Sequence, residues 1–226
     1  MDSGRGASFE RTWAVVPMRG LATAKTRLGP DLDAASRSEL AEAMLRRTLI
    51  ATRDAASIEG TVVVTKDPEV AGLAHAHHAV GLVERLPGLN EAIDAARSVA
   101  LARGATAVLV LPADLPNVTA AAIDALVAEA TAVVARVADP LGATRPQGIV
   151  ALVTDRHGLG TNALLLSPPG IIDPAFGDAS RAAHRRAAIA AGAMPVELDG
   201  PLSLDVDTPA DLLVAAAALG PAGDRG

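Results

Sequence analysis

Short aliphatic runs alternate along the chain with longer Ala-rich segments in which apolar residues recur at helical spacing. The clearest runs are 13–16, 61–65, 80–83, 106–111 and 149–154, and each has the length of one buried strand. Repeated strand–helix–strand units are typical of a parallel sheet that is covered by helices. This alternation therefore predicts an α/β fold, a mostly parallel sheet with helices on both faces.

The core has to be built almost without aromatic side chains. Half of the 226 residues are hydrophobic, yet the aromatic residues are only Phe9, Trp13 and Phe176. Ala, Val, Leu and Ile must therefore fill the interior, which suits strands that are buried on both faces. The length fits a single domain, which we expect over residues 12–219, with flexible ends at 1–11 and 220–226.

Charge and cysteine content exclude several classes of protein. The net charge is -6 and no basic run occurs, which argues against a nucleic-acid partner because such binding depends on clustered Lys and Arg. Without cysteine the chain has neither disulfides nor a thiolate nucleophile. No signal segment and no membrane-spanning apolar stretch is evident. We expect a cytoplasmic protein that does not bind membranes, and homo-oligomer formation is left open.

The second half of the chain gives weaker signals. We expect a loop with exposed backbone N–H groups over 155–164, a helix over 180–191, a last strand over 203–206 and then a terminal helix. Prolines and a glycine in 139–147 predict a mobile loop.

A loop that follows the first predicted strand carries two cations, Lys25 and Arg27. It is not a Walker A loop, because Ala24 and Arg19 stand where that motif requires glycines. Its place at the carboxyl end of a strand is nevertheless where open α/β sheets bind their ligands. The loop is therefore either a triphosphate-binding segment or a solvated basic loop.

Three aspartates are candidates for a metal site. Asp114 follows the strand 106–111, and Asp205 and Asp207 lie on one face if residues 203–206 are extended. If they converge, each pair repels by about 4 kcal/mol at ~4 Å in an effective dielectric near 20, a penalty that a divalent cation removes. Oxygen ligands favour Mg²⁺ over zinc. The alternative is that these carboxylates only cap helices.

A third candidate region is rich in glycine and small polar residues. The loop 155–164 and the segment 176–180 leave backbone N–H groups exposed, and Ser180 opens a helix whose positive end suits an anion. Together they predict a cradle for a phosphate and a carboxylate, unless they form only a hairpin loop and a helix cap. His184, one turn after Ser180, could reach the same anion.

Taken in order, these motifs resemble one family over most of the chain, from Trp13 to about Leu213. It is the 2-phospho-L-lactate or phosphoenolpyruvate guanylyltransferase family of coenzyme F(420) biosynthesis. The motifs that carry the resemblance are Val15-Val16-Pro17-Met18-Arg19, Ala24-Lys25-Thr26-Arg27-Leu28, Gly88-Leu89-Asn90, Pro112-Ala113-Asp114-Leu115-Pro116, Gly160-Thr161-Asn162-Ala163-Leu164, Phe176-Gly177 with Ser180 and His184, and Asp205-Val206-Asp207-Thr208-Pro209.

The resemblance implies a glycosyltransferase-A-like (Rossmann-like) nucleotidyltransferase fold that transfers GMP from GTP and releases pyrophosphate. Lys25 would face the triphosphate and act in catalysis with Asp114. Arg27 would help to neutralise pyrophosphate, and Asn90 would lie on the nucleoside side. The implied Mg²⁺ ligands are Asp114, Asp205 and Asp207.

The resemblance also implies that Thr161, Gly177 and Ser180 bind the acceptor, which would be phosphoenolpyruvate or 2-phospho-L-lactate. The chain departs from the family at Leu159, where Thr is common, and in the long segment 129–147. The residues themselves decide neither the acceptor nor the base of the nucleotide. A further possible acceptor is 3-phospho-D-glycerate. Alternative functions are a molybdenum-cofactor or sugar nucleotidyltransferase, or an inactive nucleotide-binding protein.

Overall fold

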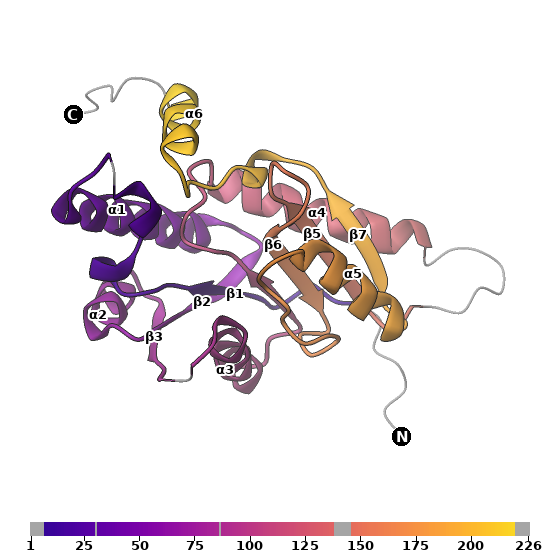
Figure 1. Ribbon diagram of the computed structural model, residues 1–226. Helices are drawn as coiled ribbons and strands as arrows, with labels where there is room; N and C mark the ends of the chain where they lie inside the picture. The colour runs from indigo at the N-terminus through magenta and orange to yellow at the C-terminus, as the bar shows by residue number, and fades with distance from the viewer. Residues whose placement is uncertain (1–6, 30, 86, 138–145, 220–226) are drawn as a thin grey trace.

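The computed structural model describes residues 7–29, 31–85, 87–137 and 146–219, and Figure 1 shows their arrangement. Seven strands form the centre: β1 Thr12–Pro17, β2 Ile58–Thr65, β3 Val80–Val83, β4 Ala107–Val110, β5 Ile149–Thr154, β6 Thr161–Ser167 and β7 Met194–Leu198. Six α-helices surround them: α1 Ala34–Asp54, α2 Pro68–Ala76, α3 Leu89–Ala102, α4 Ala120–Val137, α5 Ser180–Ala190 and α6 Pro209–Leu219. None of the helices in these ranges is both long and apolar enough to cross a membrane.

All seven strands belong to one sheet in the order β3-β2-β1-β4-β6-β5-β7. Only β6 runs against its neighbours, pairing antiparallel with β4 and β5, whereas the other pairs are parallel. The carboxyl ends of β1, β2, β3, β4 and β5 therefore meet at the same edge as the first residue of β6. Loops that leave this edge can build one common site.

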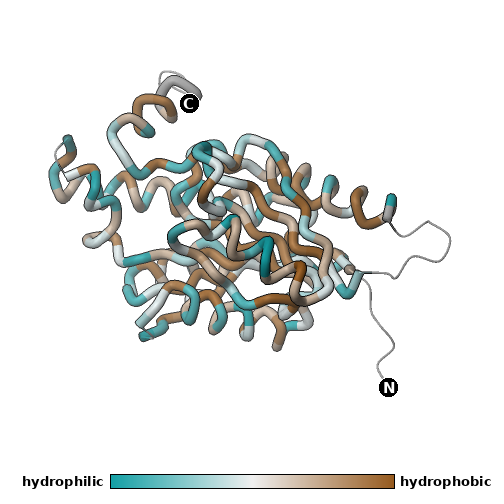
Figure 2. Tube along the Cα trace, turned by 45° about the vertical axis from the view of Figure 1, so that its right-hand side comes forward, coloured by the Kyte–Doolittle hydropathy of each residue, from teal (hydrophilic) through white to brown (hydrophobic). Residues whose placement is uncertain are grey.

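Helices cover both faces of the sheet, as Figure 1 shows. On one face Leu109 packs with residues of α1 and α4, and on the other its neighbour Val108 packs with residues of α3 and α5. Successive strand residues point to opposite faces, so β4 serves both apolar layers. The brown colour along the central strands in Figure 2 shows the same aliphatic interior. The predicted fold class is confirmed.

In the second half of the chain, some of the strands predicted from the sequence are wrong. Residues 161–167 and 194–198 form β6 and β7, which were not expected, and 203–206 is not a strand. Leu204 and Val206 are instead buried against Met44 of α1 in a small separate cluster, so their apolar character does not reflect a sheet. Most of the predicted mobile loop 139–147 lies outside the described residues.

Of the two predicted flexible ends, residues 1–6 and 220–226 lie outside the described part of the chain. Residues 7–11 lie against the body of the protein: Ser8 N donates to Ser167 Oγ at 2.8 Å, and the Ser167 hydroxyl donates to Ser8 O at 2.9 Å. Phe9 packs against the core layer beneath α4. The domain limits 12–219 stay a prediction.

Candidate active site

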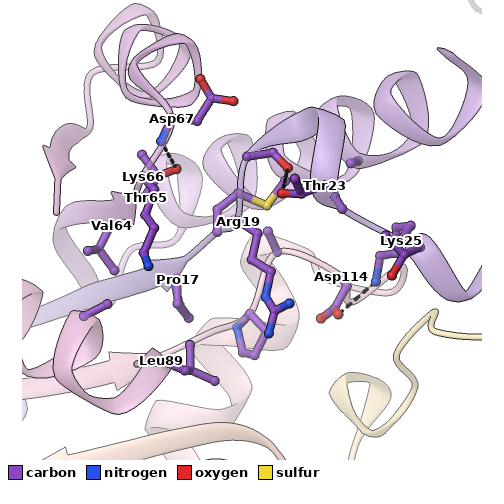
Figure 3. Close-up of a pocket in the computed structure, with 18 of the residues that line it drawn as sticks. Pro17, Arg19, Thr23, Lys25, Val64, Thr65, Lys66, Asp67, Leu89 and Asp114 are labelled. Carbon is purple, nitrogen blue, oxygen red and sulfur yellow. Dashed lines mark hydrogen bonds and ion pairs between the residues drawn. The ribbon is translucent and has the colours of Figure 1, made fainter. Parts of the chain in front are cut away.

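A cavity of about 1000 Å³ opens at the carboxyl edge of the sheet. Its walls come from the ends of β1, β2 and β4, the loop that carries Lys25, the first turn of α3, and the side chains of Phe176 and Asp207. Figure 3 shows this space bordered by the Lys25–Asp114 pair and by Leu89 of α3. Its volume is at the upper end of the usual range for small-molecule sites.

Lys25 is the centre of the charged part of the site. Its ammonium donates to Asp114 Oδ2 at 2.9 Å, to the Val206 carbonyl at 2.5 Å and to Asp207 Oδ1 at 3.4 Å. The side chain is only 8% exposed, and the backbone has a left-handed φ of 55°. That conformation costs a non-glycine residue about 1 kcal/mol or more and is concentrated at functional sites. One ammonium group thus joins segments that are 89 and 181 positions away from it in sequence.

The third predicted carboxylate, Asp205, lies within range of the charges of Asp114 and Asp207. Burial raises the pKa of Asp205, and the negative charges of Asp114 and Asp207 raise it further. Asn162 opposes this effect by donating from Nδ2 to Asp205 Oδ1 at 3.4 Å. The carboxylates are therefore close enough to repel one another, although residues 203–206 are not extended as a strand.

This donor set fits a divalent cation. Oxygen ligands suit Mg²⁺, and a cation would relieve the repulsion from Asp114 and Asp207 that adds to the effect of burial on the pKa of Asp205. Within the described ranges, however, no group of three Asp, Glu or His side chains is already arranged around one metal position. Lys25 supplies the positive charge between Asp114 and Asp207 in this structure.

The start of α6 holds Asp207 in place. Asp211 Oδ2 accepts hydrogen bonds from the backbone N–H groups of Asp207 at 3.1 Å and Thr208 at 2.7 Å, while Thr208 Oγ1 accepts from Asp211 N at 3.3 Å. Pro209 is the first residue of the helix. Thr208, Pro209 and Asp211 thus form a reciprocal helix cap.

Further cations face the same cavity. Arg27 donates to Asp207 Oδ2 at 3.3 Å, with its side chain 76% exposed. Arg19 and Lys66 also line the cavity, and neither has a hydrogen-bond or ion-pair partner within the described part of the chain. Figure 3 shows both side chains reaching into the same space. Sequence reasoning missed them as site residues, although each follows the carboxyl end of a predicted strand.

On the other side of the site, a buried histidine organises the segment expected to bind the acceptor. His184 Nε2 accepts from Ala175 N at 3.0 Å, and Nδ1 lies 3.0 Å from Thr161 Oγ1. Burial lowers the pKa of His184 to about 4, so the ring is neutral at pH 7. Because Nε2 accepts, we assign the proton to Nδ1, which donates to Thr161. His184 therefore serves as a neutral support and is not a cation that reaches the anion.

The segment before α5 has an unusual backbone. Gly177 has a φ of 133° and Ala179 a φ of 55°, both in the left-handed region. Ser180, the first residue of α5, is 2% exposed, and its N–H donates to Gly177 O at 3.2 Å. His184 links Thr161 of β6 to Ala175, two residues before Gly177.

Asn90 pairs with the backbone of a residue far away in the sequence. Its Nδ2 donates to Phe176 O at 3.1 Å and its Oδ1 accepts from Phe176 N at 2.8 Å. The amide is thus engaged with the loop that precedes α5. The cavity wall in the first turn of α3 is formed by neighbouring residues of the helix, Gly88, Leu89 and Ala92.

Comparisons with known proteins identify the chain. Residues 12–216 match the family described as "Guanylyl transferase CofC like". The chain belongs to this family. The phosphoenolpyruvate guanylyltransferase of Sphaerobacter thermophilus is 41% identical over 203 residues, which cover 89% of this chain and 90% of that protein. The enzyme of the same name from Rubrobacter xylanophilus is 38% identical, covering 88% of this chain and 91% of that protein. The family predicted from the sequence is confirmed.

Solved structures support the same fold at much lower identity. A 4-diphosphocytidyl-2C-methyl-D-erythritol synthase superposes with a TM-score of 0.60 at 15% identity, covering 93% of this chain and 99% of that one. A nucleotidyl transferase from Methanothermobacter thermautotroptrophicus gives a TM-score of 0.57 at 15% identity, covering 90% and 95%. At this identity they bear on the fold alone, which is that of nucleotidyltransferases.

Proposed function

We propose that this CofC-like guanylyltransferase transfers GMP from GTP to phosphoenolpyruvate and releases pyrophosphate, in coenzyme F(420) biosynthesis. The observation that carries the proposal is the cluster of Lys25 with Asp114 and Asp207 at the mouth of a 1000 Å³ cavity. A nucleoside triphosphate needs positive charge around its phosphates, and Arg19, Arg27 and Lys66 add to that of Lys25. The cytoplasmic location and the oligomeric state stay predictions.

We infer that Asp114, Asp205 and Asp207 hold Mg²⁺ during turnover. When bound, the ion would act as a Lewis acid on the phosphates and as a template for their alignment. Lys25 would then exchange at least part of its contact with the carboxylates for contact with the triphosphate. Burial is the main cause of the raised pKa of Asp205, but Asp114 and Asp207 raise it further, and this smaller contribution supports the assignment because it brings three carboxylates within range of one another.

In the proposed reaction an oxygen of the acceptor's phosphate attacks the α-phosphorus of GTP. The new phosphorus–oxygen bond forms as the bond to the β-phosphate oxygen breaks, and pyrophosphate leaves with the electron pair. The acceptor is already anionic, so no strong base is required. The chain has to align the reactants and offset the negative charge, roles that we give to Lys25 and Arg27.

Thr161, Gly177 and Ser180 are our candidates for binding the acceptor's phosphate and carboxylate. His184 leaves the hydroxyl hydrogen of Thr161 free to donate, because the ring already donates to the Thr161 oxygen. The names of the relatives favour phosphoenolpyruvate over 2-phospho-L-lactate and 3-phospho-D-glycerate. These acids differ little in size, and small apolar differences are worth about 1–3 kcal/mol in a pocket.

The test is pyrophosphate release from GTP and Mg²⁺ with each of the three acids supplied separately, repeated with ATP. We expect release with GTP and phosphoenolpyruvate, and a product whose mass is that of the acid plus GMP minus water. Turnover with another acid would identify that acid as the acceptor in place of phosphoenolpyruvate. No release with any combination, from folded protein that binds Mg²⁺, would overturn the proposed function.

A further inference from the structure

Helix α3 takes part in both sides of the site. Its first turn borders the cavity through Gly88 and Leu89. One residue further on, Asn90 pairs with the backbone of Phe176, whose side chain also lines the cavity. Because the amide of Asn90 both donates to and accepts from one residue, it fixes the position and the plane of the chain at Phe176.

Two other side chains hold the segment that leads to Phe176. Arg97, also on α3, donates to Ile172 O at 2.6 Å and to Pro169 O at 3.4 Å. His184 of α5 accepts from Ala175 N at 3.0 Å. Asn90 is therefore the last of three successive side-chain contacts along this segment.

Beyond Phe176 the backbone loses this support. Within the described part of the chain, no side chain makes a hydrogen bond to the backbone of residues 177–179. Gly177 and Ala179 both have a positive φ, and α5 begins at Ser180. The position of Gly177 is thus determined mainly by where Asn90 holds Phe176 and by where α5 begins. A shift at Phe176 would move the proposed acceptor-binding backbone directly.

We propose that Asn90 is a positioning residue for the acceptor, which it affects by holding Phe176 and, through it, Gly177. This inference rests on the proposed function and differs from the expectation that Asn90 lies on the nucleoside side. Both polar atoms of its amide are already used within the protein. A nucleoside contact through that amide would have to break a pairing that the fold supplies.

The test compares Michaelis constants for the two substrates in Asn90→Ala and Asn90→Asp. The first change removes both hydrogen bonds, which predicts a rise of about tenfold in the KM for phosphoenolpyruvate, with the KM for GTP within about twofold of the wild type. Asn90→Asp still accepts from Phe176 N but places a carboxylate oxygen against Phe176 O. We expect a rise in the same KM that is at least as large.

Arg97→Lys is the matched control, because Arg97 lies on the same helix and holds the same segment further from Gly177. It removes the forked contact with Ile172 and Pro169, so we expect a lower Tm and unchanged KM values for both substrates. An equal rise in acceptor KM for Arg97→Lys and Asn90→Ala would indicate general loosening and would overturn the assignment.

Two further outcomes would also overturn it: a higher KM for GTP with an unchanged acceptor KM, or no change in either. If Asn90→Ala does not fold, Asn90→Asp decides by the same criteria. If the wild type shows no turnover, the proposed function fails, and calorimetric titration with phosphoenolpyruvate alone then tests the positioning role. Weaker binding in the Asn90 variants would support it, whereas equal binding, or none in the wild type, would overturn it.

Discussion

Around Lys25 the site is held together by charges, whereas around His184 it is held by hydrogen bonds between neutral groups. Lys25 faces Asp114 and Asp207, and the pKa of nearby Asp205 is raised by burial and further by these two negative charges. His184 is fully buried and neutral, and both ring nitrogens have partners. The first region combines carboxylates with several cations that can exchange partners, while the second has its hydrogen bonds satisfied.

The two regions therefore differ in what a substitution should change. A cluster of charged side chains gains free energy when a cation and an anionic nucleotide bind to it, so its arrangement in the free protein need not be the one used in turnover. A satisfied neutral network gains nothing by rearranging, which makes it a rigid support for the proposed acceptor site. Changes in the Lys25 region should therefore affect turnover more than stability, and changes around His184 should do the reverse.

The largest effect is expected from Asp114→Asn. The asparagine oxygen still accepts from Lys25, so we expect the free energy of unfolding to change by less than about 1 kcal/mol. Losing a carboxylate that binds the metal should lower kcat by about 10³-fold or more. Pyrophosphate release and urea unfolding measure the two quantities, and turnover near that of the wild type would contradict the metal assignment.

Asp124→Asn is the matched control for that change. Asp124 accepts from Ser57 Oγ at 2.6 Å and from Ala56 N at 3.2 Å, and it does not line the cavity. Its substitution should cost about 1 kcal/mol of stability through lost hydrogen bonding and leave kcat unchanged. Asp114→Asn would then lower kcat without a large change in stability, and Asp124→Asn would lower stability without a change in kcat.

His184 should dominate the pH dependence of stability between about pH 6.5 and 4. Its pKa in the folded protein is lowered to about 4 by burial, so the unfolded chain binds a proton first as the pH falls. Stability is then lost progressively below the unfolded pKa, by roughly 3 kcal/mol in total. Urea unfolding at several pH values should show this loss in the wild type, and a smaller loss in His184→Gln.

Thr161→Val sharpens the interpretation of that experiment. It removes the hydroxyl partner of Nδ1 but keeps the buried ring, so the loss of stability on acidification should remain while the affinity for phosphoenolpyruvate falls. If His184→Gln and the wild type lost stability equally as the pH fell, the buried imidazole would not be the group responsible.

The contrast between the regions also explains what the sequence could predict. Lys25 and Asp114 each follow a recognisable strand end, and parallel strands bring such ends to one edge. Asp207 was found by its acidic pattern in front of a helix, although no strand precedes it directly. No local signal links Asn90 to Phe176, which are 86 positions apart and meet only through the packing of α3. Such a pairing depends on the tertiary fold and cannot be predicted from a local sequence motif.

The two missed strands have physical reasons as well. β6 begins directly after a glycine-rich loop, and its opening Thr161-Asn162 resembles a continuation of that loop. β7 contains Pro195 and lies at the edge of the sheet, where proline is tolerated but weakens the strand pattern. Conversely, Leu204 and Val206 are apolar because they pack on α1, and period-2 spacing alone could not separate that from a strand.

The most direct test of the contrast is the stability of Asp205→Asn. The new side chain can keep the hydrogen bond from Asn162 while removing a charge that burial and two neighbouring aspartates oppose. We therefore expect the variant to be more stable than the wild type at neutral pH, by about 1 kcal/mol or a few degrees in Tm, as seen by thermal unfolding without metal. A lower Tm would show that the carboxylate is favourably paired.

Acid and Mg²⁺ should each reduce this advantage. Because the pKa of Asp205 is raised in the folded protein, protonation stabilises the wild type below the unfolded pKa, and this benefit is lost as the pH rises through the folded pKa. The gap between variant and wild type should then narrow on acidification. Saturating Mg²⁺ should raise the Tm of the wild type more than that of Asp205→Asn, because only the wild type keeps all three carboxylates. An equal rise in the two Tm values would show that Asp205 is not a metal ligand, and its burial would then have no functional explanation.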